Sequence, residues 1–417
     1  MHLDRRAFVA ALGTVALAGC TSDSDSLPAY QPPDTTDDGG PTDTPGPGTD
    51  GETTRNGTAT GGNGNGGGNG SANGTEPTDS DAATDSSTPS APVGEPYDTP
   101  PATEPRLPLP MDRTGLRKEA RSGGPPKDGI PSIDDPIFET GDVALLDPGD
   151  PVFGLRHNGV AKAYPQKVLV SHEICNDTVG GDPVAVTYCP LTGTAMGFER
   201  GETTFGVSGR LLNNNLIMYD REHESWWPQV LASSIPSPWA ESTPASSLRE
   251  FRLIWTTWEQ WRDQYPDTEV LTGDEDHVRD YGRDPYGSYN PKGGYYEEES
   301  TLFPKLNPDD SFHPKRMFLG ARTSEGAAAF PKPALREKGT ITGTIGGDPI
   351  VAVHDPRFGT GYVYRNPDGT AVTLEDGQAI LGESAHDPDA LPLDRVYAFD
   401  AMWFAWSGFY PDSTIHE

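Results

Sequence analysis

The chain has 417 residues and a formal net charge of −32, from 31 Lys and Arg against 63 Asp and Glu. A chain this acidic has no surplus of cations to displace counterions from phosphates, so its composition argues against a nucleic-acid partner. The 49 Gly and 42 Pro are spread unevenly, and they separate a low-complexity N-terminal region from a globular remainder.

The first twenty residues have the pattern of an export signal. Arg5 and Arg6 precede an apolar run at 7–18 that is too short to span a bilayer as a helix. The twin arginine favours the export route for folded proteins. The run ends in Leu-Ala-Gly-Cys, which resembles a lipoprotein lipobox, so we expect a lipid at Cys20 that anchors the protein to the outer face of the cell membrane. An ordinary cleaved signal with a coincidental Cys is the alternative.

Residues 21–105 have the composition of a disordered tether. They carry 15 acidic residues against the single basic Arg55, and their only aliphatic residues are Leu27 and Val93. Such a segment buries too little apolar surface to offset the entropy of ordering. Four glycosylation sequons occur in the chain, three of them in this tether: Asn56, Asn69, Asn73 and, further on, Asn176.

Residues 106–417 keep a net charge of −19. This acidic surplus, with a pI near 4.5, fits a protein that lives in concentrated salt, where self-repulsion is screened. An acidic extracellular protein from ordinary salt is the alternative.

The globular region contains an internal duplication. Residues 152–200 align without gaps to 318–366 at a constant offset of 166, with 14 identities in 49 positions. A second match, at an offset of 145, pairs the segment 258–267 with 403–412. The first copy therefore has 21 more residues between its two matching segments. Repeat units that extend over 152–267 and 318–412 are too long for a solenoid, so we expect two related modules.

Short alternating apolar runs predict strands at 152–155, 159–164, 175–179 and 184–188, with further strands at 203–208 and 216–219. Aromatic residues spaced by three and four predict short helices at 258–265 and 403–410. We therefore expect a mainly β (α+β) chain with duplicated antiparallel modules, sandwich or barrel-like, each closed by a short helix. The predicted boundaries are 106–273 for copy one, 274–314 for a connector loop and 315–417 for copy two.

The Gly-Gly-Asp-Pro sequence after residue 179 predicts a hairpin turn. With the turn centred on Gly181 and Asp182, position 175 pairs near 188 and position 174 near 189. Cys175 and Cys189 then lie diagonally across one hairpin, and His172 lies one or two residues beyond it.

Several ordered motifs resemble the exported bacterial and archaeal proteins grouped as domain of unknown function 3179. The resemblance covers about 130–415 and implies no established activity. That family commonly has Cys-Pro-Leu-Cys where this chain has Cys-Pro-Leu-Thr. The second thiol is absent, so the resemblance implies no Cys-x-x-Cys redox or metal pair here. At position 175 the family usually has an aliphatic residue, whereas this chain has Cys. The motifs are His172–Asp177, Thr187–Thr194, Gly206–Gly209, Tyr219–Arg221, Arg279–Tyr281, Arg283–Gly287 and Trp403–Asp412.

The two copies differ at the residues that could carry chemistry. Cys189 aligns with Asp355, and Glu173 aligns with Gly339. Polar, nucleophilic and metal-ligating groups are thus concentrated in copy one, which places a candidate site there. The remaining differences at this site are His172 against Lys338, Cys175 against Ile341 and Asn176 against Thr342.

Four interpretations of the thiols remain open. Cys175 and Cys189 form a disulfide, although adjacent strands make its geometry awkward, or they are two buried reduced residues. They join His172 in a zinc or copper site, for which the ligand spacing is weak, or Cys189 is a nucleophile with His172 as its base and Glu173 as a further candidate catalytic residue. We expect no cofactor unless the metal site exists.

The predicted function is therefore that of a cell-surface lipoprotein whose folded domain is a binding or structural module, with a site in copy one for an unknown small molecule or surface protein. A thiol- or metal-dependent extracellular enzyme or redox protein is the alternative, and the sequence does not decide whether the chain is an enzyme. Trp226, Trp227 and Trp239 either belong to the core or stack on a sugar or partner. The candidate pocket residues are Asn176, Ser208, Arg210, Asn213, Asn214 and Asn215.

Overall fold

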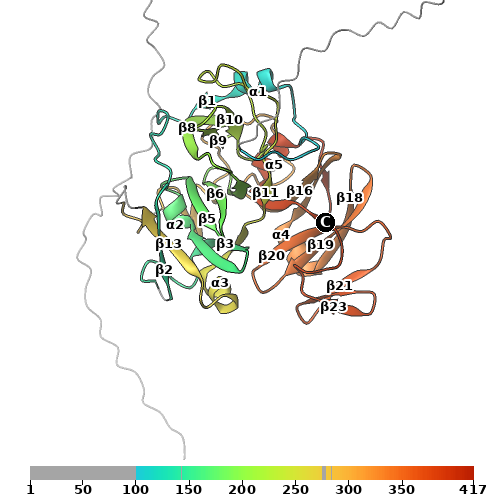
Figure 1. Cartoon of the computed structure of the whole chain (residues 1–417). Coiled ribbons are helices and arrows are strands. Elements are labelled where there is room, and N and C mark those ends of the chain that lie inside the picture. Colours follow the sequence, from blue (N-terminus) through green and yellow to red (C-terminus); the bar gives the residue numbers. More distant parts are fainter. Residues whose placement is uncertain (1–99, 142, 275–278, 283) are drawn as a thin grey trace, which may run out of the picture. The chain divides into compact units, whose positions relative to one another are not determined.

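The computed structural model describes residues 100–141, 143–274, 279–282 and 284–417. The predicted signal, the predicted lipidation site Cys20, and the sequons at Asn56, Asn69 and Asn73 lie outside these residues. The described part is mainly β, as predicted, with antiparallel sheets and five short helices (Figure 1). The helices are α1 (Arg113–Glu119), α2 (Gln166–Leu169), α3 (Trp258–Gln264), α4 (Lys332–Lys338) and α5 (Trp403–Phe409).

Copy one, green to yellow in Figure 1, is built on two sheets. The first has the order β12-β3-β4-β13-β2, and its strands are β2 (Pro136–Thr140), β3 (Pro151–His157), β4 (Val160–Pro165), β12 (Ile254–Thr257) and β13 (Glu269–Asp274). The second has the order β11-β7-β6-β5, with β5 (Ile174–Val179), β6 (Asp182–Cys189), β7 (Thr194–Glu199) and β11 (Glu250–Phe251).

Copy two repeats this plan with orders β25-β16-β17-β26 and β18-β19-β20-β24. The strand register of copy two follows from that of copy one by the two sequence offsets. Glu269 pairs in parallel with Lys162 in copy one, and the equivalent Thr414 pairs in parallel with the equivalent Ala328 in copy two. The strands are β16 (Met317–Thr323), β17 (Gly326–Pro331), β18 (Thr340–Ile345), β19 (Asp348–Asp355), β20 (Thr360–Arg365), β24 (Arg395–Val396), β25 (Ala398–Met402) and β26 (Thr414–Ile415).

The copies differ in what they insert after the shared hairpins. Copy one adds a third sheet, β1-β8-β9-β10, and copy two adds a three-stranded sheet, β21-β22-β23. The inserted strands are β8 (Phe205–Leu212), β9 (Asn215–Asp220), β10 (Trp226–Pro228), β21 (Val372–Glu375), β22 (Gln378–Leu381) and β23 (Ser384–His386). The strand β1 (Arg121–Ser122) precedes the repeat in the chain and pairs with β8. The connector contributes a short hairpin of β14 (Gly287–Tyr289) and β15 (Lys292–Gly294).

A Gly–Trp contact recurs in both copies and explains two of the repeated residues. A Cβ on Gly154 would lie 2.2 Å from the ring of Trp261, and a Cβ on Gly320 would lie 2.1 Å from the ring of Trp406. Each closing helix therefore packs a tryptophan directly onto the backbone of a strand, which only glycine permits. The aromatic spacing predicted both helices, and the structure confirms them.

A buried ion pair joins the two copies. The guanidinium of Arg322 in β16 donates two hydrogen bonds to the carboxylate of Glu250 in β11, at 2.8 and 2.6 Å. Their side chains are 0% and 7% exposed. Beside this pair, one apolar cluster contains residues of both copies, including Phe198 and Trp406.

The hairpin turn lies one residue earlier than the sequence pattern predicted. Gly180 and Gly181 have φ of 57° and 94°, and the equivalent Gly346 and Gly347 have 59° and 95°. A two-residue turn with both φ values positive matches the twist of the flanking strands and selects Gly-Gly. The pairing of Cys175 therefore moves from position 188 to Val186.

Candidate functional site

The structure keeps the two thiols apart, so of the four interpretations the disulfide is wrong. Cys175 and Cys189 are both free and buried. Cys175 pairs with Val186, and Cys189 lies three positions further along β6. Side chains alternate along a strand, so an odd separation puts the two sulfurs on opposite faces of the hairpin. They belong to separate apolar clusters, Cys175 to that of Tyr164 and Cys189 to that of Trp227.

His172 is held by partners other than the thiols. Its Nδ1 lies 2.8 Å from the carbonyl oxygen of Pro131, which accepts a hydrogen bond, and its Nε2 lies 2.8 Å from the hydroxyl of Tyr281. Both ring nitrogens are engaged and the side chain is fully buried. The predicted pairing of His172 as a base with Cys189 is therefore not present in this structure.

The weak metal candidates do not come together either. Among the residues described, no group of three or more His, Cys, Asp or Glu side chains could hold a metal ion. Cys175 and Cys189 point to opposite sides of the sheet, and His172 is bound to Pro131 and Tyr281. A shared site for these three residues would require the hairpin to be rebuilt.

The surroundings of Cys189 keep it protonated at neutral pH. Its thiol donates to the carbonyl of Asn214 at 3.5 Å and accepts from the backbone N–H of Leu216 at 3.4 Å. Burial, and then the nearby charge of Glu173, raise the pKa of Cys189 to about 11, although hydrogen bonds from Thr192 oppose this. A thiol of that pKa is a poor nucleophile at pH 7 because its thiolate is scarce.

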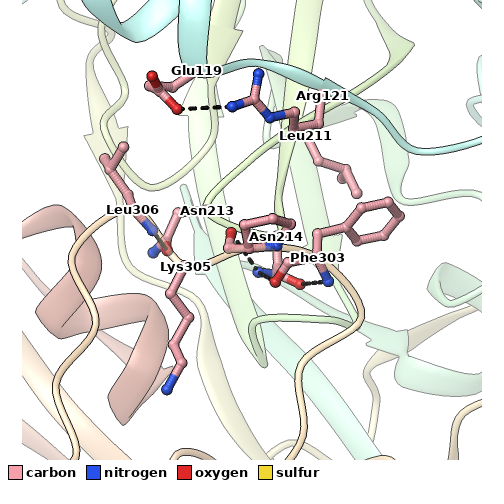
Figure 2. Close-up of a pocket in the computed structure, with 9 residues that line it drawn as sticks. Glu119, Arg121, Leu211, Asn213, Asn214, Phe303, Lys305 and Leu306 are labelled. Atoms are coloured by element: carbon pink, nitrogen blue, oxygen red, sulfur yellow. Dashed lines mark hydrogen bonds and ion pairs between the residues drawn. The ribbon is translucent and has the colours of Figure 1, made fainter.

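Asn213 and Asn214 fix the connector to copy one. The side chain of Asn214 accepts from the N–H of Phe303 at 2.8 Å and donates to its carbonyl at 3.0 Å, as Figure 2 shows. Asn213 accepts from the N–H of Leu306 at 2.8 Å. Both asparagines have positive φ, which Asn tolerates better than most residues. They lie in a small pocket lined by Glu119, Arg121, Leu211, Asn213, Asn214, Phe303, Pro304, Lys305 and Leu306.

The other predicted pocket residues are committed to internal contacts or lie at the surface. Asn215 donates to Gln229 at 2.8 Å and to Thr192 at 3.0 Å within a buried network. Ser208 donates to the carbonyl of Ile217, and Arg210 is exposed.

Asn176 is buried and bonded at both ends of its amide. It donates to Asp134 at 2.6 Å and to the carbonyl of Phe205 at 2.8 Å, and it accepts from the N–H of Phe205 at 2.9 Å. With 2% exposure, its amide is not presented as a glycan acceptor at the surface of the fold.

Glu173 stands out from the other candidates in copy one. Glu173 is 7% exposed, and its carboxyl makes no hydrogen bond or ion pair with the other residues that the structure describes. Burial raises the pKa of Glu173 to about 8, so the side chain is mostly a neutral carboxylic acid at pH 7. A buried carboxyl without a partner costs stability, and such perturbed groups cluster at functional sites.

The backbone of Glu173 is also unfavourable for a side chain. Its φ is 61°, in the left-handed region, and its N–H donates to the carbonyl of Leu169 to close α2. The equivalent Gly339 has φ of 76° and donates in the same way to Leu335. Copy two therefore uses the residue that this helix end favours, whereas copy one tolerates about 1–2 kcal/mol of strain to hold a carboxyl there.

Sequence reasoning missed a buried basic group that is linked through Tyr295 to the loop after Cys189. Lys315 is fully buried, and its ammonium donates to the carbonyls of Tyr295 and Ser300, both at 2.9 Å. Burial lowers the pKa of Lys315 to about 7. The hydroxyl of Tyr295 in turn donates to Leu191, two residues after Cys189. No local pattern marks Lys315, because its burial depends on how the connector folds over the loop after β6.

This geometry defines a duplicated, mainly β protein in which one copy holds a largely buried carboxyl with no hydrogen bond or ion pair among the described residues. A family model described as protein of unknown function (DUF3179) matches residues 127–413, and the chain belongs to this family. No curated protein and no solved structure matches the chain. Within the described residues, no helix is long and apolar enough to cross a membrane.

Proposed function

We propose that the protein is a lipid-anchored module on the outer face of the cell membrane, and that copy one binds a small polar ligand at Glu173. The supporting observation is that Glu173 combines a left-handed backbone with a largely buried side chain whose carboxyl has no hydrogen bond or ion pair among the described residues, where copy two has Gly339. Strain of this kind persists where it serves a site.

The chemistry of the carboxyl restricts the ligand. A neutral carboxylic acid both donates and accepts hydrogen bonds, so it suits a carbonyl or hydroxyl group. Cys189 beside it adds a polarisable sulfur, while its thiol proton is directed at the carbonyl of Asn214. The alternative, a thiol- or metal-dependent enzyme, has less support because Cys189 is protonated and both nitrogens of His172 are engaged.

A ligand screen by thermal unfolding tests this proposal. Polar small molecules that raise the melting temperature of the wild-type chain should have no such effect on the Glu173→Gly variant, which keeps the backbone and removes the carboxyl. Gly339→Ala is the matched control at the same position of copy two, and it should respond as the wild type does. Equal stabilisation of Glu173→Gly by every active molecule would contradict the site.

The anchor has a separate test. Changing Cys20→Ser should release the exported protein into the medium, because the lipid is the proposed membrane contact. Continued sedimentation of the Cys20→Ser protein with membranes would refute the lipid anchor without affecting the ligand site.

A further inference from the structure

A second, independent feature lies on the inserted sheet of copy one, where an ammonium group sits against two aromatic rings. The Nζ of Lys127 lies 4.3 Å from the ring centroid of Tyr219 and 4.7 Å from that of Trp239. The carboxylate of Glu224 accepts from the same Nζ at 2.5 Å. Aromatic faces together with a carboxylate are the arrangement by which proteins recognise ammonium ligands.

The two aromatic walls of this cage, Tyr219 and Trp239, are fixed by contacts that do not involve Lys127. The rings of Tyr219 and Trp239 are 5.4 Å apart at 81°, and Trp226 supports Trp239 at 5.5 Å and 82°. The hydroxyl of Tyr219, which is 2% exposed, donates to Asp128. The cage would therefore keep its shape if the lysine side chain left it.

The ammonium group of Lys127, in contrast, is connected to the fold only by the flexible side chain that carries it. The backbone around Lys127 is held by hydrogen bonds from Asp128 to Val207 and from Gly129 to Pro126, both at 2.9 Å. The side chain of Lys127 is 32% exposed, so it can rotate into solvent without moving this backbone.

We propose that Tyr219, Trp239 and Glu224 form a binding site for a quaternary ammonium group, and that Lys127 is its exchangeable internal occupant. A primary ammonium is strongly hydrated, whereas a quaternary ammonium is hydrated weakly and cannot donate hydrogen bonds to water. Exchange therefore returns the well-hydrated cation to water and places the poorly hydrated one between the rings. The carboxylate of Glu224 balances the charge in both states.

Titration of the full chain with tetramethylammonium chloride tests the site, with sodium chloride at equal concentration as the reference and tryptophan fluorescence as the readout. The wild type should show a saturable change. Lys127→Met should lower the dissociation constant by roughly tenfold, because a tethered competitor is removed. Lys118→Met, which changes an exposed lysine of α1, is the matched control and should bind as the wild type does.

Two results would overturn the proposal. One is a wild type that responds no differently to tetramethylammonium than to sodium. The other is a response of Lys127→Met that survives a further Trp239→Leu change, in protein whose circular dichroism shows that it is folded. Glycerophosphocholine, a soluble lipid headgroup, is a second probe. A response to it alone would also contradict the proposal, because the phosphate and not the cation would then be recognised.

Discussion

The two copies place different chemistry at the same backbone positions. Three equivalent positions lie at the start of the short helix after the first hairpin, near the end of the second hairpin, and on the strand before the closing helix. Strand pairing shows the equivalence of the last position: Trp255 pairs with Phe153 of β3, and Asp400 pairs with the equivalent Leu319 of β16. The three residues are Gln166, Tyr188 and Trp255 in copy one, and Lys332, His354 and Asp400 in copy two.

In copy one the connector completes these positions. The amide of Gln166 donates to Asp284 at 2.7 Å, and the ring of Tyr289 lies 5.2 Å from Trp255 and 3.9 Å from Tyr296. In this way, residues outside the repeat fill the polar and aromatic contacts that the repeat leaves open.

In copy two the partners at the same positions come from within the repeat. Lys332 donates to Asp400 at 2.7 Å, and Nδ1 of His354 donates to the carbonyl of Thr360 at 2.8 Å. The second oxygen of Asp400 is buried and has no hydrogen-bond partner in the described part of the chain. The difference shows that a shared backbone leaves its side chains free to diverge once a neighbouring segment can cover one copy and not the other.

The largest expected effect on stability comes from breaking the buried ion pair between the two copies. Glu250→Ala should lower the free energy of unfolding by about 3–5 kcal/mol, because it leaves the buried guanidinium of Arg322 without its counter-charge. Urea unfolding measures this loss. The Glu250→Leu/Arg322→Met double variant, which removes both charges, should recover most of it, and a double variant as unstable as Glu250→Ala would contradict the explanation.

The carboxyl of Glu173 in copy one should make the free energy of unfolding depend on pH. Its folded-state pKa is about 8 against an ordinary 4.5, so between these values the native protein keeps a proton that the unfolded chain has released. Stability should therefore fall as pH rises from about 4.5 to about 8, by up to about 1.4 kcal/mol per unit, and then level off. Glu173→Gln should remove this slope in urea titrations, and an unchanged slope would mean that the carboxyl is not buried.

The matched pair Lys332→Met and Gln166→Met compares the equivalent positions directly. Lys332→Met should cost about 2–3 kcal/mol, because the nearly buried Asp400 loses its cation. Gln166→Met should cost about 1 kcal/mol, because the neutral hydroxyls and Asp284 lose only hydrogen bonds. Equal losses in thermal or urea unfolding would refute this contrast between the copies.

The smallest effects concern the left-handed helix ends. Glu173→Gly should raise the free energy of unfolding by about 1 kcal/mol, because it relieves backbone strain. Gly339→Ala should lower it by about 1–2 kcal/mol, since the new Cβ would also lie 2.8 Å from that of Leu374. If Glu173→Gly is instead destabilising, the carboxyl has a structural role and the ligand proposal loses its support.

The local pattern of the chain was sufficient to predict much of the fold. Alternating residues predicted the strands at 152–155 and 184–188, and Trp spacing predicted α3 and α5. The candidate site was predicted less well. A turn displaced by one residue moves each pairing partner by two, which put Cys175 opposite position 188 instead of Val186.

The sequence by itself determined the duplication, the β class and the place of Glu173 opposite Gly339, because these depend on short-range periodicity and on comparing the chain with itself. Its ordered motifs also identified the family. Only the tertiary structure decided which polar residues were already bonded. His172 meets Tyr281 109 residues away, and Lys315 is buried by a connector with no pattern of its own. Such contacts depend on how distant segments pack, and neighbouring residues in the sequence do not encode them.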